Sequence, residues 1–163
     1  MKSFSRADSD VPSPVDINEC LESAITIVWN EIKYNCELIR DFGEIPNIAG
    51  FPQQLAQVFM NLLVNASHAI DEKGLIQLKS RFVDNQVIVT VTDNGSGISD
   101  MTMSKIFDPF FTTKDPGKGT GLGMSIAREI IQKHGGTIEV QSEVGKGSEF
   151  TIVIPVAEKK VLA

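Results

Sequence analysis

The sequence predicts an α+β fold: a two-layer α/β sandwich with three main helices on one face of a mixed, largely antiparallel sheet. Three observations predict it. Apolar residues recur at helical spacing in two segments between residues 21 and 70 and again from residue 121. Residues 75–92 and 137–154 each resemble a pair of strands joined by a short turn. Because helices and strand pairs come in separate runs, the helices are expected on one face of the sheet.

Length and composition set the limits for function. The 163 residues suffice for one domain, and 42% apolar with 22% charged residues is ordinary for a globular protein. The net charge of -6 argues against nucleic-acid binding, which needs a basic face. No apolar run approaches the ~20 residues of a membrane span, and the N-terminus lacks the apolar core of a signal peptide. Cys20 and Cys36 lack metal-site spacing and are expected to be reduced packing residues of a cytoplasmic protein.

The first helix follows a tail. Residues 1–14 are rich in Ser, Asp and Pro and are typical of a linker, and residues 158–163 are expected to be a C-terminal tail. Asp16 or Asn18 can cap the helix that follows. Its apolar stripe is Leu21, Ala24, Ile25, Val28, Trp29 and Ile32. Residues 37–42 then predict a short strand.

The second helix has a clearer apolar stripe and leads into a hairpin. Its apolar positions are Leu55, Val58, Phe59, Leu62, Leu63, Ala66 and Ile70. Pro52 stands near its start, and Gly74 is expected to end it. Residues 75–82 and 86–92 predict two strands joined by a turn at Asp84 and Asn85.

A long loop separates this hairpin from the last helix. Residues 94–120 have no sustained periodicity, and a structureless loop of this length is usually functional, often a lid. Residues 121–134 resume helical spacing through Leu122, Ser125, Ile126 and Ile130. Gly135 and Gly136 supply a left-handed stop. Residues 137–141 and 148–154 predict a closing hairpin.

The second helix also carries a polar stripe. At about 100° per residue, Asn61, Asn65 and His68 share one narrow face beside the apolar one. Asn oxygens can coordinate a hard cation such as Mg²⁺. Taken alone, the two asparagines are more readily explained as a solvated helix edge.

Asp93 ends the predicted strand and is followed by Asn-Gly-Ser-Gly. Glycines allow the backbone to approach a ligand closely, and a carboxylate there can accept a hydrogen bond from an exocyclic amine such as that of adenine. An ordinary Asp-Asn-Gly turn is the alternative.

A second glycine-rich stretch, residues 117–123, precedes the last helix. Backbone N–H groups at a helix N-terminus form a natural phosphate site, and Lys114 and Lys118 add positive charge to an acidic chain. The spacing matches neither a P-loop nor the dinucleotide fingerprint. A flexible linker would explain the glycines but not their place at a helix start. Phe107, Phe110 and Phe111, in the loop before this stretch, either anchor it to the core or mark a contact surface.

The order of these motifs resembles the catalytic, ATP-binding domain of sensor histidine kinases, within the group that includes gyrase, the Hsp90 chaperones and MutL. Residues 57–66 resemble the N box, 93–97 the first glycine box, 107–111 the F box and 117–123 the second glycine box. The resemblance covers roughly residues 15–156 and the motif set is highly specific. It implies an ATP-binding catalytic domain at 15–157, with residues 99–120 as an ATP lid.

The resemblance also implies site residues. Asn65 would bind Mg²⁺, Asp93 the adenine amino group, and Asn61 the metal or phosphate region, with His68 as a basic phosphate contact. The residues implied to be catalytic are Asn61, Asn65 and Lys114. The nucleotide contacts would be Asn61, Asn65, His68, Asp93, Gly95, Gly97, Ile98, Phe110, Lys114, Lys118, Gly119, Thr120, Gly121, Leu122 and Gly123.

Position 61 distinguishes activities within the group. Its ATPases and serine kinases resemble one another in carrying Glu there, which can act as a general base. Asn61 cannot take a proton, whereas a neutral histidine nucleophile needs no base. The sequence therefore favours phosphoryl transfer to histidine. An ATP hydrolase and a non-catalytic ATP-sensing module are the alternatives.

His68 and His134 both lie outside the His-Glu/Asp setting that the family uses as phosphoacceptor. The chain is therefore expected to be a monomeric fragment of a longer sensor kinase, which lies in the cytoplasm even where the full-length protein is membrane-tethered. Its expected partners are an upstream dimerisation domain with the acceptor histidine and the receiver domain of a response regulator.

Overall fold

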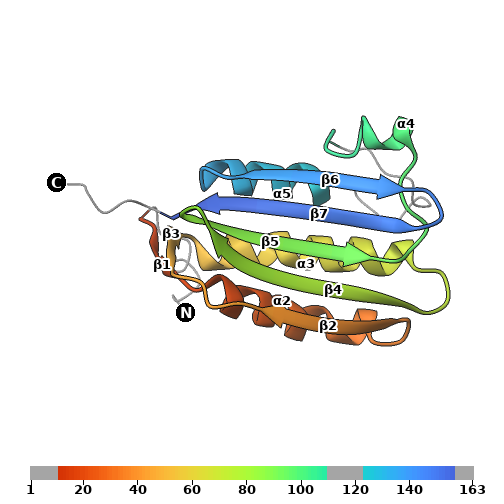
Figure 1. Cartoon of the computed structure of the whole chain (residues 1–163), viewed down its shortest axis with the longest axis horizontal. Coiled ribbons are helices and arrows are strands. Elements are labelled where there is room, and N and C mark those ends of the chain that lie inside the picture. Colours follow the sequence, from red (N-terminus) through yellow and green to blue (C-terminus); the bar gives the residue numbers. More distant parts are fainter. Residues whose placement is uncertain (1–10, 110–122, 157–163) are drawn as a thin grey trace.

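The computed structural model describes residues 11–109 and 123–156. It is a two-layer α+β sandwich in which three helices cover one face of a five-stranded sheet (Figure 1), as the sequence predicts. The helices are α2 (Ile17–Ile32), α3 (Pro52–Ala69) and α5 (Gly123–Lys133), and a short helix, α4 (Asp100–Met103), follows the hairpin of β4 and β5. The strands of the sheet are β2 (Cys36–Phe42), β4 (Gly74–Val83), β5 (Gln86–Asp93), β6 (Thr137–Glu143) and β7 (Gly147–Pro155).

The sheet has the order β2-β4-β5-β7-β6. Only β2 and β4 pair in parallel, and α3 forms the crossover that a parallel pair requires. In the antiparallel part, Asp93 at the end of β5 lies opposite Ile76 on one side and Ser148 on the other. Two three-residue strands, β1 (Ser13–Val15) and β3 (Ile48–Gly50), form a separate ribbon that the sequence did not predict, because such short strands show no period.

Helix α2 is capped at its N-terminus by Asp16, whose carboxylate accepts hydrogen bonds from the backbone N–H groups of Asn18 (2.9 Å) and Glu19 (3.4 Å). Of the two predicted caps, Asp16 is therefore the one used. Trp29 was predicted to face the core, which is wrong: it is 40% exposed. It adjoins the buried Val28, and a side chain one residue along a helix is rotated by about 100° away from the core.

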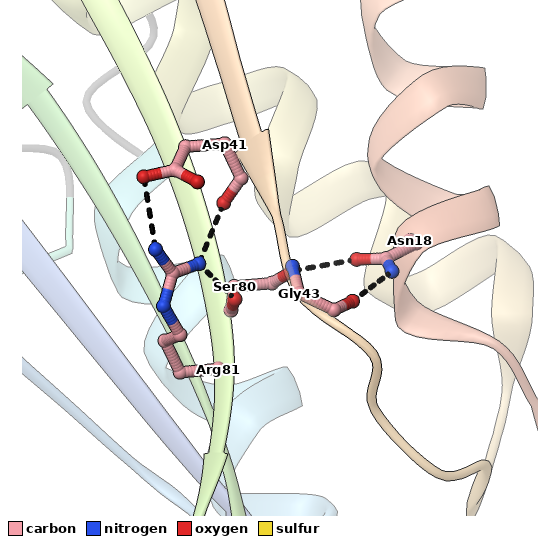
Figure 2. A network of polar contacts seen from close by, with 5 residues as sticks. All are labelled: Asn18, Asp41, Gly43, Ser80 and Arg81. Carbon is pink, nitrogen blue, oxygen red and sulfur yellow. Dashed lines mark hydrogen bonds and ion pairs between the residues drawn. The ribbon is translucent and has the colours of Figure 1, made fainter.

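Asn18 instead ties α2 to the sheet (Figure 2). Its side-chain nitrogen donates to the Gly43 carbonyl (3.0 Å), and its oxygen accepts from the Ser80 hydroxyl (2.7 Å). Arg81 extends this network by donating to the backbone carbonyl and the carboxylate of Asp41, both at 2.9 Å. The network joins β2, β4 and the start of α2.

Helix α3 ends earlier than predicted, at Ala69. The side-chain nitrogen of Asn35 donates to the carbonyls of Ser67 and Ile70, each at 3.1 Å. This amide satisfies helix-terminal carbonyls, so no glycine is needed at the C-terminus. Gly74 does not end the helix but opens β4, where its N–H donates to the Asn35 carbonyl (2.9 Å).

Helix α5 faces the core with Met124, Ala127 and Ile131. Ile126 belongs to the helical spacing of the sequence but is not a core position, since its side chain is 37% exposed. The predicted stop is confirmed: Gly135 has φ +78°, and the N–H of Gly136 donates to the Ile131 carbonyl (2.9 Å).

Both predicted hairpins are present. Asp84 and Asn85 have φ of 53° and 63°, as a tight primed turn requires, and β6 and β7 are joined through Gly145 at φ +86°. The expected long loop contains α4, capped by the Ser99 hydroxyl, whose four residues are too few to show a period. Both cysteines are buried and free, as predicted. Within the described residues, no helix has the length and apolar character needed to cross a bilayer.

Candidate nucleotide-binding site

Asp93 is a carboxylate at the buried end of a central strand. It is 6% exposed, and its oxygen accepts a hydrogen bond from the Gly95 N–H (2.8 Å). Burial raises the pKa of the Asp93 carboxyl above its usual range, and hydrogen bonds from the backbone N–H groups of Gly95 and Ser148 partly oppose this. The alternation of apolar residues along β5 puts its last residue on the helix-covered face.

The loop after Asp93 packs tightly against the end of α3. The Ser96 N–H donates to the Ala69 carbonyl at 2.8 Å. A Cβ added to Gly95 would come within 2.7 Å of the Ala69 carbonyl carbon. Only glycine therefore fits at position 95 without moving the helix terminus.

The other side of this loop rests on the β6–β7 hairpin. Gly97 has φ +81°, and an added Cβ would lie 2.8 Å from the carbonyl carbon of Glu143. The Ile98 N–H donates to the Ser142 hydroxyl (2.7 Å), which also contacts the Ser148 hydroxyl (2.9 Å). These contacts hold the residues after Asp93 between α3 and the hairpin.

Sequence reasoning missed both serines and also Gly147. The signal was present at Ser148, a polar residue at an inward-facing position of an otherwise apolar strand. A Cβ on Gly147 would lie 2.9 Å from the Cα of Asn94, so the hairpin closes directly over the start of the loop. A shallow hollow of about 380 Å³ lies at this end of the sheet. It is bordered by Asp93, Ser142 and Ser148 and also by Thr92, Gln141 and Glu149, so it reaches the face of the sheet away from the helices.

The polar stripe of α3 meets two different neighbours. The side-chain nitrogen of Asn61 donates to the Gly123 carbonyl (3.0 Å), and its oxygen accepts from Gln57 (3.1 Å). His68, two turns on, has its Nε2 3.7 Å from the Glu31 carboxylate of α2. Asn65 lies between them and is half-buried. The structure thus brings the N box to the last glycine of the second glycine box.

Part of the predicted site lies outside the described residues: Phe110, Lys114, Lys118, Gly119, Thr120, Gly121 and Leu122. Of the F box, Phe107 is described. It is half-buried, and the Arg128 guanidinium of α5 lies 5.4 Å from its ring centroid. This contact supports anchoring of the segment by its aromatic residue. Ile98 packs against the core cluster.

Residues 50–158 match the family model described as histidine kinase-, DNA gyrase B- and HSP90-like ATPase, which is more than half of the chain. The chain belongs to this ATPase family.

Within the family, the chain is similar to sensor histidine kinases. The chain is 44% identical over 149 residues to the sensor histidine kinase ZraS of Salmonella typhimurium, which covers 90% of the chain and 32% of ZraS. The Escherichia coli ZraS is 38% identical over 144 residues, covering 87% of the chain and 30% of ZraS. The chain therefore spans about a third of the length of these relatives.

Solved structures agree on the domain. The catalytic domain of the histidine kinase ThkA superposes with a TM-score of 0.78 at 33% identity, covering 88% of the chain and 95% of that domain. Full-length ShkA in complex with AMPPNP gives a TM-score of 0.78 at 27% identity, covering 94% of the chain and 34% of ShkA. The chain is thus an ATP-binding catalytic domain of the histidine kinase type.

The described residues of this ATPase-family domain fit an adenine nucleotide with a hard metal ion. A buried carboxylate at a rigid strand end suits an amino group of a base. The amide oxygens of Asn65 and Asn61 are hard donors of the kind that Mg²⁺ accepts, and the Asn61 oxygen also accepts a hydrogen bond from Gln57. Asp93 is the last residue of β5, and both asparagines lie on α3, so a strand and a helix that pack together carry the candidate ligands.

Proposed function

We propose that this domain binds ATP with Mg²⁺ and transfers the γ-phosphoryl group to a histidine on a dimerisation domain. The observation that carries the proposal is the state of Asn61, whose amide is bonded at both ends, to Gln57 and to Gly123. An amide at this position cannot remove a proton from water. It links the N box to the second glycine box instead.

Base recognition falls to Asp93. Its carboxylate is held by the Gly95 N–H on one side and lies opposite Ser148 on the other, so it is oriented before the nucleotide arrives. A preorganised acceptor loses little conformational freedom on binding and selects an amino-bearing purine such as adenine.

Phosphoryl transfer to an imidazole needs positioning more than acid–base chemistry. A neutral histidine nitrogen already has a free lone pair, so the attack proceeds without a base at position 61. Helix α3 sets the geometry, because it carries Asn65 and contacts both the loop after Asp93, at Ala69, and the start of α5, at Asn61.

Asn65 would hold the metal. A bound Mg²⁺ supplies neutralisation of the charge that develops on the phosphate oxygens during transfer. Lys114, Lys118 and the backbone amides of residues 119–123 would hold the triphosphate, and His68 would contact it from α3.

The proposal also concerns the longer protein. Residues 1–14 would connect to an upstream dimerisation domain, residues 15–157 would be the catalytic domain, and residues 158–163 a tail. ThkA has been solved in complex with the response regulator protein TrrA, which supports a response regulator as the downstream partner here. The domain would act in the cytoplasm as a monomeric unit of a dimeric kinase.

The first test measures binding and turnover together. The purified chain is titrated with ATP, with and without Mg²⁺, while phosphate release is followed in the same sample. We expect Mg²⁺-dependent binding with negligible release. Sustained turnover would identify an ATP hydrolase, and absence of binding would contradict the proposal.

Variants on α3 assign the roles. Asn65→Ala and Asn65→Asp are expected to lose the Mg²⁺-dependent part of the affinity and transfer to a separately supplied histidine domain. Gln53→Ala, an exposed position on the same helix, is the matched control and keeps both. Normal transfer by folded Asn65→Ala would refute the metal role.

A further inference from the structure

His134 joins two elements of the site at the end opposite the glycine boxes. It stands just after α5, and its Nε2 accepts a hydrogen bond from the Phe51 backbone N–H (3.0 Å). Its Nδ1 lies 2.8 Å from the Ile130 carbonyl. A nitrogen that accepts from an N–H carries no proton, and one that meets a carbonyl must donate. Together the two contacts specify one neutral tautomer of the ring.

Among the described residues, the Phe51–His134 and Asn61–Gly123 hydrogen bonds link the two ends of α5 to α3. Phe51 is the N-terminal cap of α3 and meets the C-terminal end of α5, whereas Asn61 meets Gly123 at the start of α5. The two helices therefore run antiparallel. The span from Phe51 to Asn61 is about 15 Å of helix, and that from Gly123 to His134 about 16 Å, so both bonds form in one register.

The register matters because each helix carries a different part of the proposed site. Helix α3 carries Asn65, and α5 begins at Gly123, the last residue of the second glycine box. A slide of α5 along α3 would change the spacing between the metal ligand and the phosphate-binding amides. Positioning errors of about 1 Å can cost roughly 100-fold in a reaction of this type.

We propose that neutral His134 is a positioning residue for Mg²⁺-ATP binding, which sets the register of α5 on α3 through its hydrogen bond to Phe51. The inference rests on the proposed function and adds a residue far from the nucleotide to the site. It also makes nucleotide affinity depend on the protonation of this ring.

The surroundings of the ring favour the neutral form. Burial lowers the pKa of His134 below its usual range, and the nearby charge of Lys133 lowers it further, against the opposing effect of the Ile130 carbonyl. The ammonium group of Lys133 lies 4.4 Å from the centroid of the Phe51 ring. From the other side, β3 and the α3 cap present Gly50 and Phe51, which carry no charge. A protonated Nε2 would place one N–H against another and break the bond.

One side of the half-buried ring is packed against β3 and the α3 cap. A Cβ on Gly50 would lie 2.7 Å from Nε2, and the Phe51 ring packs edge-on at a centroid distance of 5.7 Å. A ring that loses its bond is then held in place only by these contacts, and in the proposal α5 moves relative to α3 and transmits the change to the site.

Two substitutions separate the acceptor from the ring. His134→Gln places an amide oxygen near the position of Nε2 and does not titrate, whereas His134→Phe keeps a ring without an acceptor. We measure Mg²⁺-ATP affinity of the whole chain from pH 5.5 to 8, and follow titration of the His134 ring by NMR. Each variant is confirmed as fully folded by circular dichroism under the binding conditions, so loss of stability alone cannot change the affinity.

We expect His134→Gln to bind like the wild type at pH 8, and His134→Phe to bind about tenfold more weakly. Phosphate groups titrate near pH 6, so the ratio of wild-type to His134→Gln affinity is used, which cancels this common effect. That ratio should fall as the His134 ring becomes protonated. Wild-type affinity in folded His134→Phe, or a ratio that stays constant while the ring titrates, overturns the proposal.

A separate measurement distinguishes an error in the positioning role of His134 from an error in the proposed function. Amide hydrogen exchange at Phe51 reports the bond without nucleotide, and its protection should fall in His134→Phe but not in His134→Gln. If the wild type shows this protection but binds no ATP, the proposed function is refuted and the positioning role with it. If it binds ATP and loss of the protection leaves the affinity unchanged, only the positioning role is refuted.

Discussion

Gly97 and Gly145 form a matched pair that tests how tightly the first glycine box is held. Both have left-handed backbone, with φ of +81° and +86°. A Cβ on Gly97 would lie 2.8 Å from the carbonyl carbon of Glu143 and 2.9 Å from the Cα of Val144, whereas a Cβ on Gly145 meets nothing within 4 Å. Alanine at the two positions therefore shares the backbone cost, and only alanine at 97 adds a clash with the hairpin.

The magnitudes follow from these contacts. Left-handed backbone costs alanine about 1–2 kcal/mol, offset by about 0.4–1 kcal/mol from the stiffer unfolded chain. Gly145→Ala should thus lower the free energy of unfolding by about 1 kcal/mol. Gly97→Ala must also displace backbone atoms, and overpacking of this kind adds about 1–3 kcal/mol. Its total cost is expected to be about 3 kcal/mol.

Urea unfolding of the two variants beside the wild type measures these differences, and ATP titration follows their effect on the site. Gly97→Ala should weaken ATP binding even where it is folded, because the loop after Asp93 must move away from Glu143. Gly145→Ala should bind normally. Equal destabilisation of the two variants would show that the loop is not held against the hairpin, and would refute the packing argument.

Two further predictions concern buried polar groups. Burial raises the pKa of Asp93 in the folded protein, so the ionised carboxylate opposes folding. The free energy of unfolding should therefore fall as pH rises from 3.8, the pKa of this carboxyl in the unfolded chain, through its higher pKa in the folded protein. Asp93→Asn should remove this pH dependence and raise the thermal unfolding midpoint at neutral pH. The same variant should bind ATP about tenfold more weakly, and an unchanged ATP affinity would refute the contact between Asp93 and the base. Asn35→Ala leaves the Ile70 carbonyl without its side-chain donor and removes one of two hydrogen bonds to the Ser67 carbonyl, which keeps the Ile70 backbone N–H. This should lower the free energy of unfolding by about 2 kcal/mol in urea, against no measurable change for the exposed Asn47→Ala. A loss in Asn35→Ala no larger than that of the control would show that the α3 terminus is satisfied in another way.

Much of the fold could be predicted from local sequence pattern. The apolar stripe of α3, the primed turn at Asp84 and Asn85, and the glycine stop after α5 each depend on residues close together in the chain. The pattern was ambiguous elsewhere. Ile126 and Trp29 are apolar residues beside a buried stripe, and only the packed helix decides which neighbouring position faces inward.

The candidate site divides in the same way. Asp93, the asparagines of α3 and the glycine boxes are contiguous motifs, so the sequence by itself determined their identity and the chemistry they can perform. The placement of Asp93 and of the first glycine box was decided by the tertiary structure, through Ser142, Ser148 and the Ala69 carbonyl. The bond from Phe51 to His134 spans 83 residues. Local sequence patterns cannot predict such contacts, because the contacts form only when the helices pack on the sheet and bring distant backbone groups within hydrogen-bond distance.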